Sequence, residues 1–321
     1  MQESMRLSPY QKRRLKQIIL KWGARVPIDP ATCSKGVALC RALHEHGIPT
    51  TIGKFSHDSD PPETIEAEYQ FCSTSLRAAS EESSFYLSLK PPALRFDTRR
   101  AWNICDVAIQ NGHGVHFDSH DHDLQGSTIA LLENMMRQTR AGLPKASCWR
   151  WGLTLPSRWK RSLADLRWAI KNDIRVRLVK GEFKAPCSSN EMDPREGFLT
   201  MVERLAGSVS EIAIATHDHQ LAREAIERAR EKKTHVELEL LFGMPACGMI
   251  ALSKKMQTSL RFYVAYGENM LLYGIRHYLT NPRKFLRPQL GTALGGANAK
   301  LCNILRRCED KNRNCYKWKQ S

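Results

Sequence analysis

Short runs of alternating or β-branched apolar residues recur along the chain, and longer stretches with helical spacing separate them. The runs predict eight strands, at residues 49–55, 85–89, 115–117, 151–155, 176–179, 212–215, 236–241 and 261–264. They recur about every 30 residues, which is the length of one strand–loop–helix–loop unit. Eight such units in succession predict an α/β fold, a closed parallel (β/α)8 barrel of the TIM type.

The stretches between the strands have the apolar spacing of amphipathic helices, at residues 63–80, 163–171, 194–205 and 220–232. We expect Asp193 to cap the third of these, with Pro194 in its first turn. A doubly wound sheet would need a glycine-rich phosphate turn after its first strand. The sequence PTTIGKFSHD contains no GxGxxG, so the barrel is favoured.

Two further helices are expected ahead of the barrel, one from Ser8 and Pro9 to about residue 23 and one at residues 32–46. Another is expected near the end of the chain, at about residues 298–307. The predicted organisation is therefore an N-terminal helical extension at 1–47, a catalytic barrel at 48–283 and a basic tail at 284–321.

Composition places the protein among globular chains, with 42% hydrophobic and 26% charged residues. Its apolar runs are about four or five residues long, far below the ~20 residues of a membrane span, so we expect no integral membrane protein. Ten cysteines occur but none forms a CxxC pair, which argues against a zinc site and favours reduced thiols in the cytoplasm.

The net charge of +16 lies mostly at the two ends of the chain. Residues 1–25 carry a net charge of +6 and residues 300–321 carry +5, so the body of the protein is close to balanced. This distribution favours an enzyme with basic ends over a groove for a phosphate backbone, and we expect no specific nucleic-acid partner.

Charged and polar residues follow the predicted strands where a barrel enzyme has its chemistry, at the C-terminal strand ends. Lys90 follows the second strand, Asp118 the third, the turn Pro156–Arg158 the fourth and Lys180 the fifth. Thr216 and His217 follow the sixth. Five of the eight predicted strands end in this way, and together they predict a functional face.

Five phrases of the sequence carry a family resemblance: YLSLKPPAL, RVRLVKG, IATHD, ELELLFGM and RFYVAYGENMLLYGIRHYLTNP. They resemble proline dehydrogenase, a flavin-dependent barrel enzyme whose phrases read approximately SIKLSAL, RLVKGAY, ATHN/D, EFQLLYGM and YVPYG…Y..RR. The resemblance covers about residues 47–283, in the same order and spacing. It implies a cofactor, FAD, bound non-covalently at the strand-end face.

The resemblance also implies roles for individual residues. Lys90 and Asp118 match residues on the substrate side of the flavin, and Arg177 matches an arginine near flavin N5. The matched cofactor contacts are Lys180, Gly181, Glu182, Thr216 and His217. Walls of the substrate pocket are matched by Leu241, Tyr263 and Tyr273, and Arg276 matches the first of two arginines that hold the substrate carboxylate.

Physical reasoning agrees with these implied roles. Reduction of a flavin builds negative charge on its ring, which a permanently charged arginine such as Arg177 would stabilise. Lys90 and Asp118 on adjacent strand ends would form a buried ion pair. Tyr273 and Arg276 are three residues apart, so on a helix they would share one face.

The sequence departs from the family pattern at four positions. His277 stands where the second carboxylate arginine is expected, and Pro156 replaces a glutamine that contacts the flavin. Glu182 replaces an alanine, and Thr280 replaces an acid beside the arginine pair. The barrel and the flavin-edge arginine are retained, whereas the clamp for an amino-acid carboxylate is altered.

The segment HFDSHDHD, residues 116–123, has metal-ligand residue types after a barrel strand and suggests a metal-dependent hydrolase as an alternative. Only His116 and Asp118 would share one face of an extended strand, and the others fall in a loop, so we assign no metal ligands. A non-catalytic barrel whose basic ends bind an acidic partner is a second alternative.

The leading hypothesis is a flavin-dependent oxidoreductase that oxidises L-proline, or a related secondary amino acid, to the cyclic imine by hydride transfer to flavin N5. Asp118 and Arg177 are its predicted catalytic residues, and Lys90, Arg276 and His277 its predicted polar substrate contacts. The resemblance implies a quinone-type electron acceptor. The basic ends are expected to hold a cytoplasmic enzyme near anionic lipid, at the periphery of the inner membrane.

Overall fold

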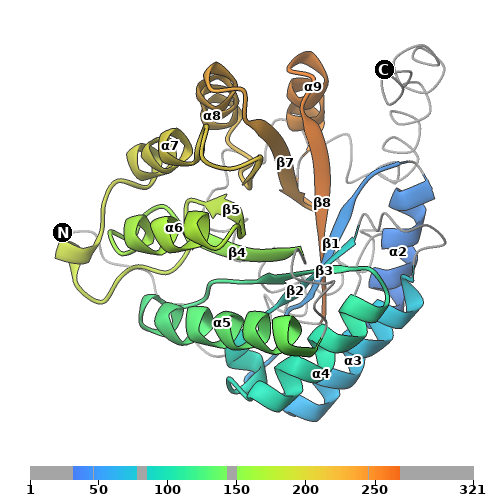
Figure 1. Cartoon of the computed structure of the whole chain (residues 1–321). Coiled ribbons are helices and arrows are strands. Elements are labelled where there is room, and N and C mark those ends of the chain that lie inside the picture. The colour runs from blue at the N-terminus through green and yellow to red at the C-terminus, as the bar shows by residue number, and fades with distance from the viewer. Residues whose placement is uncertain (1–31, 46, 78–84, 143–149, 245, 268–321) are drawn as a thin grey trace, which may run out of the picture. The chain divides into compact units, whose positions relative to one another are not determined.

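A computed structural model describes residues 32–45, 47–77, 85–142, 150–244 and 246–267, all within one compact unit, Pro30–Leu272. These residues contain a closed barrel of eight parallel strands in chain order (Figure 1). The strands are β1 (Thr50–Lys54), β2 (Phe85–Leu89), β3 (Gly114–Phe117), β4 (Trp151–Pro156), β5 (Arg175–Val179), β6 (Glu211–Ile214), β7 (His235–Leu241) and β8 (Ser259–Tyr266). The predicted barrel is confirmed, because each predicted strand coincides with an observed one.

Helices surround the strands on the outside of the barrel (Figure 1). They are α2 (Cys33–Glu45), α3 (Pro62–Ser75), α4 (Thr98–Gln110), α5 (Gln125–Gly142), α6 (Ser162–Lys171), α7 (Pro194–Leu205), α8 (His219–Glu231) and α9 (Cys247–Lys255). Asp193 caps α7 as predicted, since its carboxylate accepts from the N–H groups of Arg195 at 2.8 Å and Glu196 at 2.9 Å.

The predicted helices at 163–171, 194–205 and 220–232 correspond to α6, α7 and α8, and the one at 32–46 corresponds to α2. The helix predicted at 63–80 ends earlier, because α3 stops at Ser75. The sequence reasoning did not assign α4, α5 and α9. The helices predicted at 8–23 and 298–307 lie outside the described residues.

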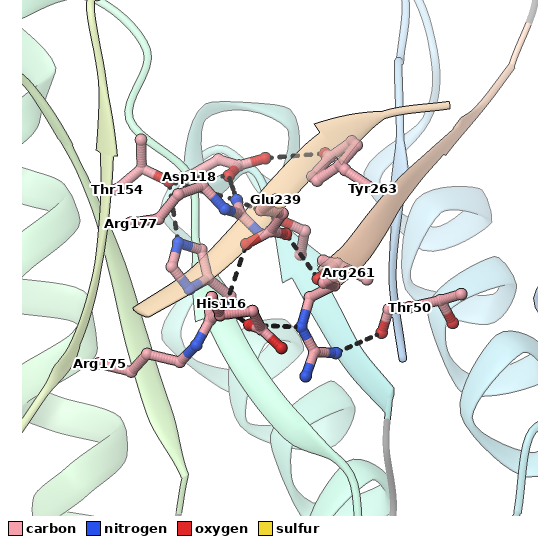
Figure 2. A network of polar contacts seen from close by, with 12 residues as sticks. Thr50, His116, Asp118, Thr154, Arg175, Arg177, Glu239, Arg261 and Tyr263 are labelled. Atoms are coloured by element: carbon pink, nitrogen blue, oxygen red, sulfur yellow. Dashed lines mark hydrogen bonds and ion pairs between the residues drawn. The ribbon is translucent and has the colours of Figure 1, made fainter. Parts of the chain in front are cut away.

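Successive side chains along each strand alternate between the helices outside the barrel and the interior of the barrel. Their outward side chains pack against the helices and form an apolar core that includes Ile52, Leu87, Val115, Leu153, Val176, Leu178, Ile212, Leu238 and Val264, all at most 4% exposed. Their inward side chains are mostly polar and contact one another across the barrel (Figure 2). Since charges cost much free energy when isolated from water, this interior requires them to be paired.

The lower part of the interior is an ion-pair layer. Arg175 binds Glu211, Glu237 and Glu239, while Arg261 binds Glu237 at 2.8 Å and donates to the Thr50 carbonyl at 2.9 Å. The guanidinium groups of Arg175 and Arg261 lie 4.8 and 4.9 Å from the ring centroid of Tyr86. This layer closes the barrel below the strand-end face.

Candidate functional site

Asp118 lies directly after β3 and is the centre of the polar group at the strand-end face (Figure 2). One carboxylate oxygen accepts from Arg177 Nη1 at 2.7 Å and Thr154 Oγ1 at 3.1 Å. The other accepts from Lys90 Nζ at 3.1 Å and Tyr263 Oη at 2.9 Å. The expected ion pair of Lys90 and Asp118 is present.

Four donors keep Asp118 ionised. Burial by itself would raise the pKa of this carboxyl group, but the positive charges of Lys90 and Arg177 outweigh that effect. The pKa of Asp118 is therefore held well below its usual range. With every oxygen already accepting two hydrogen bonds, Asp118 is built to orient its neighbours and is unsuited to take up a proton.

Arg177, in the middle of β5, is only 3% exposed and joins two carboxylates. Its Nη1 binds Asp118, and its Nη2 binds Glu239 at 2.6 Å. Burial would lower the pKa of Arg177, but the two carboxylates raise it. Arg177 therefore stays charged inside the barrel, and its charge is balanced from both sides.

Glu239 on β7 is a central residue of this network that the sequence reasoning did not single out. It accepts from Thr51 Oγ1 at 2.7 Å and from both Arg177 and Arg175. Burial opposes its ionisation, but the two guanidinium groups hold the pKa of Glu239 well below normal. The available signal was the alternation of RVR in β5 with ELE in β7, which places two charges of each sign on one face.

His116 on β3 lies one layer below Asp118 and is fully buried. Burial and the charges of Arg177 and Arg175 lower its pKa, so the ring is neutral. Its Nε2 is 2.9 Å from Thr154 Oγ1, and that hydroxyl donates to Asp118. The Nε2 of His116 is thus assigned as the donor in this chain of contacts. Gly152 of β4 makes room, because a Cβ there would collide with the ring.

Lysine and aromatic side chains shape the mouth above Asp118. Lys90 Nζ donates to Tyr263 Oη at 3.0 Å and lies 4.3 Å from the ring centroid of Phe55. Tyr263 is seated by Gly53 of β1, where a Cβ would collide with the tyrosine hydroxyl. Burial is the main cause that raises the pKa of Tyr263, so its phenol keeps its proton.

The residues assigned to the cofactor lie at the ends of β5 and β6. Lys180 Nζ is 3.2 Å from Asp218, and Thr216 Oγ1 accepts from the Asp218 N–H at 3.1 Å. His217 Nε2 accepts from the N–H of Leu241 at 3.1 Å, which connects the β6 end to the last residue of β7. These contacts join the ends of β5, β6 and β7 into one continuous rim.

Gly181 and Glu182 extend this rim past Lys180. Arg158 donates to the carbonyl of Gly181 at 3.3 Å and to that of Glu182 at 3.1 Å. Gly181 has φ of +90°, and a Cβ there would come within 2.8 Å of the Cβ of Pro156. Glycine is thus required by both backbone conformation and space.

Of the remaining residues predicted to line the pocket, the structure describes two and leaves three undescribed. Leu241 is the last residue of β7, and Tyr263 lies within β8, opposite Leu241 in register. Tyr273, Arg276 and His277 lie outside the described residues, and their assignments stay predictions.

The metal-ligand segment at 116–123 does not converge in space. His116 and Asp118 face the barrel interior, whereas His120 pairs with Asp121 at 3.0 Å and His122 with Asp123 at 2.8 Å. Within the part of the chain that the structure describes, no three His, Cys, Asp or Glu residues are arranged to hold a metal ion. The described residues therefore give no support to the hydrolase alternative.

Among the described helices, none combines the length and hydropathy needed to cross a bilayer. The sequence matches no protein-family model and no curated protein.

Solved structures of proline utilization A proteins do match. One from Bdellovibrio bacteriovorus, inactivated by N-propargylglycine, superposes with a TM-score of 0.70 at 14% identity, covering 85% of this chain and 34% of that chain. One from Corynebacterium freiburgense gives a TM-score of 0.62 at 15% identity, covering 92% and 36%. The present chain spans about a third of the length of these proteins. The comparison confirms, for the fold, the resemblance to proline dehydrogenase: the described barrel is similar to part of these proline utilization A structures.

Proposed function

We propose that the protein is a flavin-dependent oxidoreductase of the proline dehydrogenase type, which oxidises L-proline or a related secondary amino acid to the cyclic imine. The observation that carries this proposal is the convergence of Lys90, Asp118, Arg177 and Tyr263 at the C-terminal end of the barrel. The sequence resemblance assigns the first three to the flavin and substrate wall, and they come from three different strands.

The residues present fit a bound flavin. The strand-end rim provides the ammonium group of Lys180, and Arg177 has a buried Nε without a hydrogen-bond partner among the described residues. Gly181 lets the backbone turn where a side chain would collide. FAD would supply the hydride acceptor at N5, and positive groups beside it would stabilise the charge that reduction adds.

In this proposal Asp118 orients the site and is no proton acceptor. It holds Lys90 and Tyr263 by one oxygen and Arg177 by the other, so that both cations keep fixed positions. Glu239 fixes the second arm of Arg177. Leu241 and Tyr263 would line the substrate ring, and Arg276 would bind the substrate carboxylate. Rigid positioning of this kind favours hydride transfer because little reorganisation accompanies it.

The proposed electron acceptor is a quinone, as the family resemblance implies. The basic segments at 1–25 and 300–321 would hold a cytoplasmic enzyme against anionic lipid, where such acceptors reside.

The experiment is a visible absorption spectrum of the purified protein after reconstitution with excess FAD. We expect a flavin band, and bleaching of that band when L-proline is added without oxygen. A protein that retains no FAD after gel filtration would refute the proposal. If FAD is retained but proline does not bleach it, the cofactor assignment stands and a panel of secondary amino acids then tests the substrate assignment.

A matched pair of lysine variants tests whether FAD binds at the strand-end rim. Lys180→Met removes an ammonium group from the proposed cofactor rim and should weaken FAD binding about 10-fold or more. Lys171→Met removes an exposed lysine at the end of α6, which leads into the opposite end of β5, and should leave FAD binding unchanged.

A further inference from the structure

Two cysteines from neighbouring helices meet beside β1, on the outer side of the barrel. Cys33 is the first residue of α2, and Cys72 lies in the last turn of α3. Their sulfur atoms are 2.8 Å apart. A disulfide bond measures about 2.05 Å, so the sulfurs would need to approach by less than about 1 Å.

The two thiols differ in access and in acidity. Cys33 is half-buried, whereas Cys72 is fully buried. The hydrogen bond from Cys72 lowers the pKa of Cys33, against the effects of burial and of the negative charge of Glu68. Burial raises the pKa of Cys72 well above normal. The position of Cys33 at the start of a helix also favours its thiolate, and the ammonium group of Lys54 adds to this.

We propose that Cys33 and Cys72 are a redox-active pair, in which a hydroperoxide oxidises Cys33 and Cys72 then closes a disulfide. In the first step the Cys33 thiolate attacks one peroxide oxygen. The S–O bond forms, the O–O bond breaks, and the leaving alkoxide or hydroxide takes a proton. In the second step Cys72 attacks the sulfenic acid, the S–S bond forms and water leaves. Two thiols lose two electrons, and the peroxide is reduced to an alcohol or water.

The disulfide would join α2 to α3, the two helices that cover β1. Glu68 and Tyr69 lie one turn before Cys72 on α3 and already bind the end of β1: Glu68 pairs with Lys54 at 2.9 Å, and Tyr69 Oη lies 3.2 Å from the Lys54 N–H. Because these contacts already hold α3 against β1, formation of the disulfide would require no rearrangement of the barrel. This inference does not depend on the proposed dehydrogenase function.

The test treats the full-length protein with hydrogen peroxide, then counts thiols after denaturation and maps the linked peptides by mass spectrometry. We expect loss of two thiols, a peptide containing Cys33 linked to one containing Cys72, and reversal by dithiothreitol. In Cys72→Ser, whose hydroxyl can still donate to Cys33 but cannot form a disulfide, the sulfenic acid of Cys33 should persist and be trapped by dimedone. In Cys33→Ser, Cys72 should remain reduced.

Cys187 gives the matched control. It is exposed, its pKa is lowered by a hydrogen bond from Ser189, and among the described residues its sulfur contacts that hydroxyl and no second thiol. Cys187→Ser should leave the Cys33–Cys72 linkage unchanged. Cys33 should react at least about tenfold faster than Cys105, which is buried in α4. Oxidised Cys187 beside fully reduced Cys33 and Cys72, or linkage of Cys33 to Cys40 instead, would overturn the proposal.

Discussion

Asp118 shows how a residue that looks like a general base can be arranged for another task. Its two oxygens accept four hydrogen bonds, two of them from cations, and its pKa is lowered accordingly. The same logic applies to Glu239, which has two guanidinium groups beside it. At the residue scale the site is therefore a set of fixed charges, and the energetic effect of each residue depends on its partners.

Arg177→Met tests whether the stabilising effect of each buried charge depends on its partners. The substitution leaves Asp118 and Glu239 without their common cation, so we expect a loss of about 3–5 kcal/mol in the free energy of unfolding. The double variant Arg177→Met/Glu239→Gln neutralises one of the two carboxylates that have lost this cation and should recover at least ~1 kcal/mol. Urea unfolding measures both.

Arg228→Met is the control for that measurement. Arg228 pairs with Glu203 on the surface, where both side chains are well exposed. The expected loss is below about 1 kcal/mol. Equal losses for Arg177→Met and Arg228→Met would contradict the view that the buried network carries stability.

In the proposed function, His277 takes the place of the second arginine that the resemblance implies for the substrate carboxylate, and it lies outside the described residues. A histidine offers at most one charge-assisted hydrogen bond where an arginine offers two. If the substrate is proline, His277→Arg should tighten proline binding about 10- to 150-fold. Anaerobic titration of flavin reduction measures this, and His277→Gln, which adds no charge, should not tighten it. Tight proline binding in the parent, unchanged by arginine, would contradict the assignment.

At the scale of elements, apolar alternation and capping residues predicted most of the elements that carry both signals, but α4, which Asp97 caps, was missed. All eight strands and the Asp193 cap of α7 were predictable, because β-branched runs and an Asp–Pro pair are local signals. The start of α5 follows directly on a short turn, His122–Leu124, without a polar cap. The nine-residue α9 begins without a side-chain cap and has Gly248 in its first turn. The starts of α5 and α9 therefore have no capping residue that the sequence would reveal. These helices are stabilised mainly by packing against the barrel.

The site was predictable in part, because some of its residues have a local signal in the sequence and others do not. Positions after strand ends, such as Lys90 and Asp118, follow from the topology of any such barrel. Glu239 and His116 lie inside the barrel, where their role depends on which residues of other strands they meet. That information is three-dimensional, since Glu239 and its partner Thr51 are 188 residues apart in the chain.

The Asp193 cap provides a prediction at this scale. Asp193→Ala removes two hydrogen bonds from the first turn of α7 and should cost about 0.5–2 kcal/mol in the free energy of unfolding. Glu227→Ala, at an exposed position inside α8, should change it by less than about 0.5 kcal/mol. Thermal or urea unfolding distinguishes them, and an unchanged midpoint for Asp193→Ala would show that the cap adds nothing to global stability.

At the scale of the whole molecule, stability depends on pH through the cross-strand pair of Glu211 and His235. Burial would raise the pKa of Glu211, but His235 and Arg175 lower it to about 2. The hydrogen bond to Glu211 raises the pKa of His235 above 6.5. The Glu211 contribution is present above pH about 4.5 and is lost as the pH falls, whereas the His235 contribution is present below about 6.5 and is lost as the pH rises through the raised pKa.

His235→Ala should therefore lower the free energy of unfolding at about pH 5.5, by less than ~1 kcal/mol because the pair is partly exposed, and hardly at all at about pH 9. Urea unfolding at the two pH values measures the difference. Gln220→Ala, at an exposed position in α8, removes no ionisable group and serves as control, with the same effect expected at both pH values. Equal losses from His235→Ala at both pH values would show that the histidine acts by packing and not by charge.

The polar interior of the barrel also constrains how the sequence can drift over evolutionary time. An apolar interior tolerates single exchanges of similar volume, whereas an interior of paired charges does not. Among homologous chains, loss of the cation at position 177 should therefore accompany loss of the acid at position 239. Likewise, a residue larger than glycine at position 152 should be found only where His116 has been replaced by something smaller. Such linked exchanges would mark the lineages in which the chemistry of this barrel has changed.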